Sequence, residues 1–149
     1  MKKIITILSF FIGILFLPGI TSSAQAQDVV VIVNKANPIG DMTAGKVKLY
    51  YLRKIKKRWP GNNLSIKLVT IKGNSGTKNA FLEILGMADT EMSQYFSQRQ
   101  FANAEAPPKV LANYAAVIKY VSENEGAIGY ISKVAYDAAS SRVKVVFTH

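Results

Sequence analysis

The chain has 149 residues, with 19 Lys and Arg against 9 Asp and Glu, a single His and no Cys. The absence of cysteine excludes disulfides, thiolate zinc sites, iron–sulfur clusters and a cysteine nucleophile. The lone histidine, His149, is the last residue, which leaves neither a Ser-His-Asp triad nor a multi-histidine metal centre. The hydrophobic fraction of 49% and the charged fraction of 19% are typical of one globular domain. We therefore expect a globular protein with no metal, no cofactor and no enzymatic activity.

The first 26 residues have the pattern of a secretory signal peptide. Two lysines precede an apolar core over 4–20, and Ala24-x-Ala26 fits the small-residue cleavage rule. An uncleaved membrane anchor is the alternative, although a core of about 17 residues lies at the lower limit for spanning a bilayer. We expect a signal peptide at 1–26 and a single mature domain at 27–149. Because an exported chain without cysteine suits the bacterial periplasm, we expect periplasmic localisation.

The formal net charge is +10 at pH 7. An excess of positive charge attracts anions, and export argues against a nucleic-acid partner. The expected partners are an anionic small molecule, an anionic envelope surface or an acidic protein face.

Hydrophobic periodicity predicts strands that alternate with helices. Residues 29–33 are continuously apolar and rich in β-branched side chains, which is typical of a strand buried on both faces. A helix capped by Thr43 and ending at Trp59 is predicted next, with the apolar stripe Val47, Tyr50, Tyr51 and Ile55. The later elements are a strand at 64–71, a helix at 76–87, a helix capped by Asp89, a helix at 109–124, and strands at 127–131 and 143–147. This alternation predicts an α/β fold, a three-layer sandwich around a mostly parallel sheet.

The segment 72–78 lies between a predicted strand and a predicted helix. Such a turn directs backbone N–H groups and the positive end of the helix dipole toward one point, an arrangement that binds oxyanions without catalytic groups. The segment adds hydroxyl donors and positive charge through Ser75, Thr77, Lys72 and Lys78. An ordinary capped helix start, in which Ser75 or Thr77 accepts from first-turn amides, explains the pattern equally well.

Two catalytic motifs are partly matched by this segment. Thr77 precedes Lys78, so the G-K-[ST] order of a Walker A loop is absent. Ser75-x-x-Lys78 matches the S-x-x-K signature of serine β-lactamases, but no S-D-N or K-T-G follows it. Neither a P-loop nor acyl-enzyme chemistry is therefore expected.

Two further features stand out along the chain. A run of cations interleaved with aromatic residues comprises Lys46, Lys48, Arg53, Lys54, Lys56, Lys57 and Arg58. It is either an anion-binding or docking surface or, as we favour, a solvated helix face whose aromatic residues Tyr50, Tyr51 and Trp59 are buried on the other side. The segment 125–130 combines a helix stop at Gly126 with close packing at Gly129, and on its own it is structural.

Four motifs recur together in one known family. In chain order they are Val33-Asn34-x-x-Asn37-Pro38, Lys54-x-x-x-x-Trp59, Ser75-Gly76-Thr77 with Phe81, and Gly126-Ala127-Ile128-Gly129-Tyr130. With them the chain resembles the phosphate-transporter substrate-binding proteins, within the type 2 periplasmic binding protein superfamily. The resemblance covers nearly all of 27–149 and implies a short form with the fold of one lobe of these two-lobed proteins.

The resemblance implies that Ser75, Gly76 and Thr77 contact phosphate through hydroxyl and backbone N–H groups. Lys72, Asn74 and Lys78 join this ligand-binding set on charge and proximity alone. We therefore expect an exported solute-binding domain for phosphate or a similar oxyanion, linked to ABC transport through a membrane permease. The alternative is an envelope interaction module that kept the lobe fold, lost transport ligand binding and uses the basic 46–58 face to dock on an acidic partner or membrane.

Overall fold

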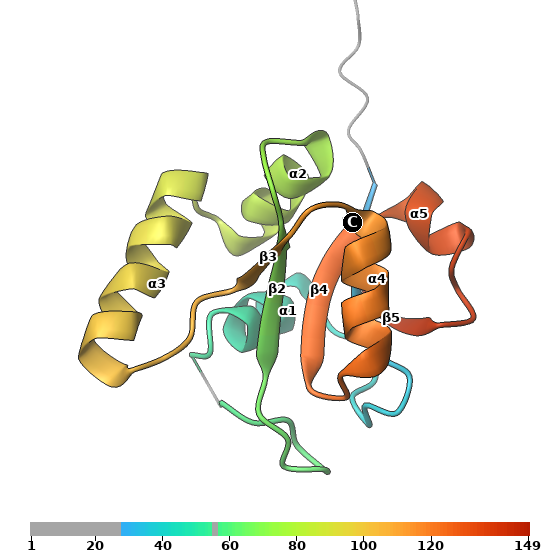
Figure 1. The fold of residues 1–149 in the computed structure, drawn as a ribbon, viewed down its shortest axis with the longest axis horizontal. Helices are drawn as coiled ribbons and strands as arrows, with labels where there is room; N and C mark the ends of the chain where they lie inside the picture. The colour runs from blue at the N-terminus through green and yellow to red at the C-terminus, as the bar shows by residue number, and fades with distance from the viewer. Residues whose placement is uncertain (1–27, 55–56) are drawn as a thin grey trace, which may run out of the picture.

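The computed structural model describes residues 28–54 and 57–149, so the expected signal peptide lies outside the described residues. Five strands form one sheet in the order β3-β2-β4-β1-β5 (Figure 1). Their bounds are β1 Val29–Asn34, β2 Lys67–Ile71, β3 Lys109–Leu111, β4 Ala127–Ser132 and β5 Val143–Thr148. β2 pairs in parallel with β3 and β4, whereas β1 pairs antiparallel with β4 and β5. Four strands therefore run one way, and the expected mostly parallel sheet is confirmed.

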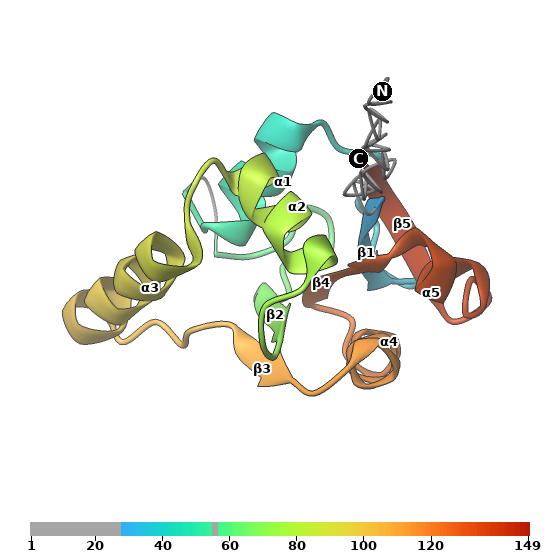
Figure 2. The ribbon, with the colours of Figure 1, turned by 90° about the horizontal axis from the view of Figure 1, so that it is seen from above.

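Helices cover both faces of the sheet, as Figure 2 shows. They are α1 Ala44–Tyr51, α2 Gly76–Leu85, α3 Asp89–Asn103, α4 Tyr114–Glu123 and the short α5 Lys133–Asp137. Side chains of α1, α2 and α3 belong to one hydrophobic core, and α4 and α5 pack against a second. The fold is thus the expected three-layer α/β sandwich. None of the helices described within 28–54 and 57–149 has the length and apolar character needed to span a bilayer.

Strand β1 is buried along its whole length, as its sequence predicts. Val29, Val31 and Val33 point into the larger core, whereas Val30 and Ile32 point into the smaller one, because successive side chains of a strand face opposite sides. This alternation places β1 between the two helical layers.

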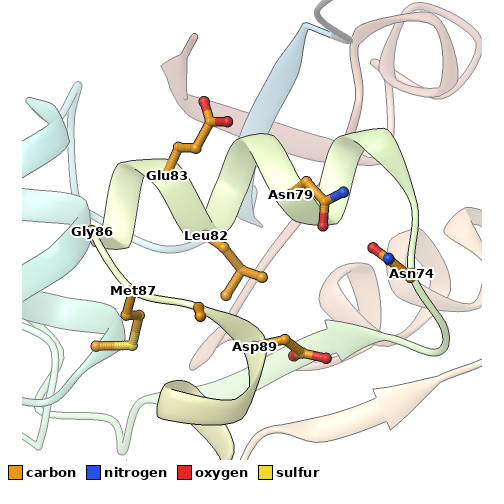
Figure 3. Close-up of a pocket in the computed structure, with 8 residues that line it drawn as sticks. Asn74, Asn79, Leu82, Glu83, Gly86, Met87 and Asp89 are labelled. Atoms are coloured by element: carbon orange, nitrogen blue, oxygen red, sulfur yellow. The ribbon is translucent and has the colours of Figure 1, made fainter.

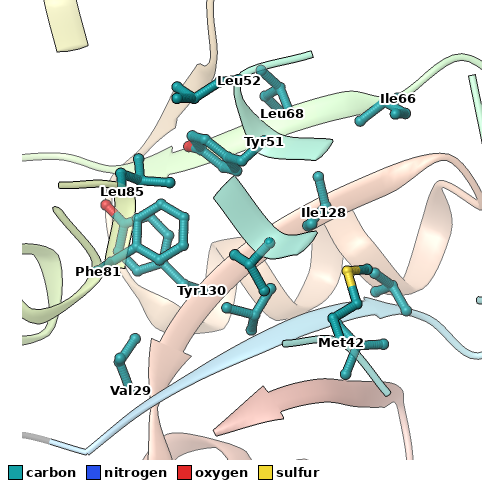
Figure 4. Close-up of a cluster of buried hydrophobic side chains, with 14 of the residues drawn as sticks. Val29, Met42, Tyr51, Leu52, Ile66, Leu68, Phe81, Leu85, Ile128 and Tyr130 are labelled. Atoms are coloured by element: carbon teal, nitrogen blue, oxygen red, sulfur yellow. The ribbon is translucent and has the colours of Figure 1, made fainter. Parts of the chain in front are cut away.

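Aromatic rings fill the larger core, part of which is drawn in Figure 4. Phe81 of α2 stacks on Tyr130 of β4 with ring centroids 4.0 Å apart, and Tyr51 of α1 meets Phe81 edge-on at 4.8 Å. Offset stacks and edge-on pairs are the favourable arrangements of aromatic rings. These contacts fix α2, and with it the turn that precedes it, against the sheet.

The first predicted helix is shorter than expected. It begins after the Thr43 cap as predicted, but α1 ends at Tyr51 rather than at Trp59. Arg53 has a left-handed backbone conformation with φ of 52°, which terminates the helix. Its guanidinium donates to the backbone carbonyls of Ile66 and Ala106, at 3.0 and 2.9 Å. Long-range contacts therefore stop a helix that local periodicity would continue.

The predicted helix at 109–124 is wrong in its first turn. Lys109–Leu111 forms β3, which pairs with β2, and α4 begins at Tyr114. The true cap is Asn113, whose side-chain oxygen accepts from the Ala116 N–H at 2.9 Å. Val110 fits the apolar helical stripe but lies on this edge strand, where it is 59% exposed.

Other element ends differ by a few residues. The predicted cap Asp89 is instead the first residue of α3, and the preceding Ala88 occupies the cap position. The side chain of Glu91 accepts from the Ala88 N–H at 2.7 Å. Helix α2 ends before Gly86, which has a left-handed φ of 65°. The strand expected from residue 64 begins at 67, and α5 was not expected.

Candidate functional site

The turn between β2 and α2 lies at the carboxyl end of a parallel strand. In open α/β sheets ligands bind beyond this edge, where the connecting loops meet. The turn is held beside β3 because the Lys72 N–H donates to the carbonyl of Leu111 at 2.8 Å. Gly73 adopts a φ of 81°, a conformation that glycine enters without steric cost. The 72–78 turn is thus a defined connection at the edge of the sheet where ligands bind in open α/β folds.

Helix α2 starts with the predicted hydroxyl cap. The Ser75 hydroxyl oxygen accepts from the Lys78 N–H at 3.2 Å, so the side chain satisfies one first-turn amide. This hydroxyl still carries its own proton, which can be donated to a ligand oxygen. Ser75 is half-buried and Gly76 is exposed, so both can be reached from solvent.

Thr77 occupies a different environment. Its side chain is fully buried, and the Tyr114 hydroxyl at the start of α4 donates to Thr77 Oγ1 at 2.8 Å. The contact joins α2 to α4 across the edge of the sheet. Thr77 therefore anchors the turn, and its hydroxyl lies inside the protein.

Lys78 and Asp89 form an ion pair beside the turn. The Lys78 side chain is 10% exposed, and its ammonium lies 2.8 Å from Asp89 Oδ1 at the start of α3. The side chain of Asp89 is 52% exposed. A carboxylate therefore already neutralises one of the two lysines of the predicted site, whereas Lys72 is exposed.

A pocket of about 310 Å³ opens next to these lysines. Its lining includes Lys72, Gly73 and Lys78, together with Asp89. Side chains of α3 and β3, among them Met92, Phe96 and Val110, line the rest. The structure thus brings Lys72 and Lys78 together on one pocket.

Asn74 lines a different pocket, of about 570 Å³, whose described lining includes neither Lys72 nor Lys78. Figure 3 shows Asn74 on the turn, Asn79 and Glu83 on α2, and Asp89 at the start of α3. The residues that line it include two carboxylates and no cation. Asn74 therefore faces an acidic environment. Of the six predicted ligand-binding residues, Ser75, Gly76 and Thr77 are outside the linings described for both pockets.

Buried hydroxyls lie beneath the carboxyl end of β2. The oxygen of Thr70 lies 2.8 Å from the Tyr130 hydroxyl, and the Tyr51 hydroxyl donates to the carbonyl of Val69 at 2.9 Å. Burial raises the pKa of both tyrosines above the ordinary value of 10.0. Both phenols are therefore neutral at physiological pH and add no negative charge near the turn.

The basic run at 46–58 is partly neutralised by a residue that sequence reasoning missed. Glu105 is 7% exposed and receives two bonds from the Arg99 guanidinium, at 2.7 and 3.0 Å. Lys57 lies 2.8 Å from the same carboxylate, and Arg53 lies 4.0 Å from it. The hydrogen bonds from Arg99 lower the pKa of Glu105 to about 2. No local pattern could reveal this cluster, because Glu105 is far from the run in sequence.

The interpretation of the run as a solvated helix face holds only in part, because Lys54, Lys57 and Arg58 follow the end of α1. Tyr51 and Trp59 are buried, whereas Lys46, Lys54 and Arg58 are exposed. The predicted stripe and run also include Ile55 and Lys56, which lie outside the described residues.

Across residues 28–54 and 57–149 there is no group of three or more acidic or histidine side chains that could hold a metal ion.

Comparison with known proteins finds similarity at the level of structure. No protein-family model and no curated protein sequence matches the chain. A phosphate ABC transporter substrate-binding protein with bound phosphate from Clostridium perfringens is 28% identical, with a TM-score of 0.63 over 80% of this chain and 44% of its own. An ABC-type phosphate transport receptor from Vibrio cholerae is 23% identical, with a TM-score of 0.60 over 80% of this chain and 45% of its own. PstS from Borrelia burgdorferi is 16% identical, with a TM-score of 0.61 over 80% of this chain and 46% of its own.

The chain therefore shares its fold with part of these solute-binding proteins and spans less than half of their length. This agrees with a single lobe of the periplasmic binding protein fold.

Proposed function

We propose that this protein is an exported solute-binding domain that binds phosphate or a similar oxyanion at the 72–78 turn. The observation that carries the proposal is a Ser-Gly-Thr helix start at the carboxyl end of a parallel strand, beside a pocket lined by Lys72 and Lys78. A solved structure with bound phosphate that shares the fold supports the same ligand. Under this proposal, cleavage after Ala26 releases the domain into the periplasm, where it works with a membrane permease and catalyses no reaction.

Solvent can reach three of the proposed contact residues, Ser75, Gly76 and Lys72, whereas Lys78 is buried and paired with Asp89. Ser75 donates its hydroxyl proton, Gly76 offers a first-turn amide, and Lys72 and Lys78 supply positive charge. Thr77 holds the turn in place through the bond from Tyr114.

Replacing Ser75 or Lys72 with alanine is expected to weaken phosphate binding. Each loses one charge-assisted contact, worth about 1–3 kcal/mol for a hydrogen bond to a charged group. Calorimetric titration of the purified protein with phosphate measures the change. Ser75→Ala should also lower the free energy of unfolding by about 1 kcal/mol, because α2 loses its cap.

Lys35→Ala is the matched control, because Lys35 is an exposed lysine that follows β1 at the opposite edge of the sheet. Tyr114→Phe separates anchoring from binding, since it removes the hydroxyl that donates to Thr77 and leaves the turn residues unchanged. If Ser75→Ala and Lys72→Ala bind phosphate as tightly as Lys35→Ala does, the turn is not the site.

Replacing Asp89 with asparagine is expected to tighten phosphate binding several-fold. The change frees the Lys78 ammonium and removes a carboxylate that repels an anion in the pocket. For a half-exposed ion pair the expected gain is about 0.5–1 kcal/mol. Glu83→Gln, which removes an exposed carboxylate that lines only the second of the two described pockets, should have a smaller effect. Weaker binding by Asp89→Asn would show that Asp89 supports the ligand instead.

The interaction module remains a second candidate, because Lys46 and Lys54 are exposed and form no ion pair among the described residues. Replacing both lysines with glutamate reverses their charge and should then abolish retention of the protein on anionic vesicles. This retention depends on electrostatic attraction, which salt screens beyond a Debye length of about 8 Å at physiological ionic strength. The matched control reverses Lys35 and Lys119, two exposed lysines elsewhere. If the two double variants are retained equally, the basic 46–58 face is a solvated surface. In both double variants the phosphate affinity should stay within about threefold of the wild-type value. This corresponds to a change in binding free energy of less than about 0.7 kcal/mol.

A further inference from the structure

The 310 Å³ pocket beside the turn is lined by both charged and apolar side chains. Its charged residues are Lys72, Lys78 and Asp89, and because Asp89 pairs with Lys78 the three carry a net charge of +1. Its apolar lining includes Met92 and Phe96 of α3 and Val110 of β3, beside polar residues such as Ser97. Net positive charge and apolar surface within one pocket suit a ligand that itself has an anionic group and an apolar body.

The volume of the pocket also favours a ligand larger than inorganic phosphate. Because one water occupies about 30 Å³ in the liquid, the pocket has room for roughly ten waters. Inorganic phosphate has five heavy atoms and would leave most of that space to water. Small-molecule sites generally begin at about 300 Å³. The volume therefore fits a compact organic molecule and is too small to enclose the acyl chains of a phospholipid.

The apolar wall is partly open to solvent. Val110 is 59% exposed, although it belongs to a strand and faces this pocket. Covering such a surface with an apolar group is favourable, at about 25 cal/mol per Å². Bare phosphate has no group that could cover it.

We infer that the ligand of this site is a soluble phosphomonoester with a small apolar or aromatic substituent. Its phosphoryl oxygens contact the 72–78 turn and the two lysines, and its substituent lies along α3 toward Val110. The inference rests on the proposed oxyanion site and adds the class of molecule that this site selects.

The experiment compares phenyl phosphate, inorganic phosphate and phenol by calorimetric titration at pH 8, where both phosphates are mainly dianions. Phenyl phosphate should bind at least tenfold more tightly than inorganic phosphate, which corresponds to 1.4 kcal/mol. Phenol should not bind measurably, because the phosphoryl group anchors the ligand. Vesicles that contain phosphatidic acid should not compete with phenyl phosphate.

A substitution that fills the pocket tests whether the apolar substituent of the ligand lies there. Ser97 is an exposed residue of α3 that lines the pocket, and Ser97→Trp should remove the advantage of phenyl phosphate while leaving inorganic phosphate affinity unchanged. Gln98→Trp is the matched control, because Gln98 is exposed on the same helix and lies outside this lining. Val110→Glu tests the same wall from β3 and should act in the same direction.

Each result decides a separate point. Equal affinity of the wild-type protein for both phosphates would overturn this inference and leave the oxyanion site standing. An advantage for phenyl phosphate that survives both Ser97→Trp and Val110→Glu would place the substituent outside the pocket and overturn the inference. Binding of phenol alone, or competition by the vesicles, would also overturn it. Failure of both phosphates to bind at millimolar concentration would reject the proposed function itself.

Discussion

Replacing Glu105 with glutamine is expected to lower the free energy of unfolding by about 3 kcal/mol at pH 7. The change removes the negative charge that Arg99, Lys57 and Arg53 share, and it leaves the half-buried Arg53 without its counter-charge. Breaking a buried ion pair by removing one partner typically costs about 3–5 kcal/mol. The exposure of Lys57 places the expected value at the lower end of that range.

The same residue predicts a pH dependence. The pKa of Glu105 is lowered to about 2, so its contribution to stability is present above the unfolded pKa of about 4.3 and is lost as the pH falls toward 2. Urea unfolding of the wild-type protein and Glu105→Gln at several pH values measures this. The two stability curves should be farthest apart above pH 5 and converge as the pH approaches 2. A constant gap across this window would contradict the ion-pair explanation.

Replacing Gly126 with alanine is the second change with a large expected effect. An added Cβ would lie 2.2 Å from the backbone oxygen of Ser65, a distance that forces the backbone to move. The carbonyl of Gly126 also accepts from Trp59 Nε1 and from the Lys67 N–H, both at 2.9 Å. Overpacking costs about 1–3 kcal/mol, and a backbone clash that also disturbs two hydrogen bonds should reach the upper end of that range. Chemical denaturation measures the loss.

Gly45→Ala is the control for the change from glycine to alanine. Gly45 lies in α1, and its added Cβ would approach nothing closer than Thr43 Oγ1 at 3.9 Å. Alanine should stabilise this helix by as much as about 1 kcal/mol. Equal effects of the two substitutions would show that the close approach to Ser65 is not what requires glycine at 126.

The elements that were predicted correctly are those whose patterns reflect local burial. The apolar run at 29–33 forms a strand buried on both faces, because it lies at the centre of the sheet between two helical layers. Thr43 and Ser75 cap helices, since a hydroxyl that accepts from first-turn amides acts within three residues. The interpretation of Gly126 as a helix stop is wrong, because α4 ends at Glu123 with Asn124 as its cap and Gly126 has no left-handed φ. The close approach of the Ser65 carbonyl is what requires glycine there.

The errors arose where distant residues decide the local structure. Arg53 ends α1 in a left-handed conformation that its sequence neighbours do not indicate, and contacts with Ile66 and Ala106 hold its side chain there. Lys109–Leu111 is a strand because β2 offers it an open edge. The Asn113 cap was the local signal that could have corrected the predicted helix start.

The position of the ligand site stays a prediction, but the structure changes how its predicted residues are grouped. Proximity in sequence grouped Asn74 with Lys72 and Lys78, whereas the structure places Asn74 on the neighbouring acidic pocket. The pairing of Lys78 with Asp89 depends on how α3 packs, which periodicity does not report. The pocket wall was missed for the same reason as β3, because Val110 was assigned to a helix.

An amide chemical-shift titration of the purified protein with phosphate shows whether the 72–78 turn binds an oxyanion. One measurement reports both whether phosphate binds and which backbone N–H groups sense it. We expect saturable shifts concentrated at the turn, above all at Gly73, Ser75 and Gly76, with little change at Lys46 or Lys54. Saturable shifts confined to the basic 46–58 face, or no saturable shift at millimolar phosphate, would contradict this expectation.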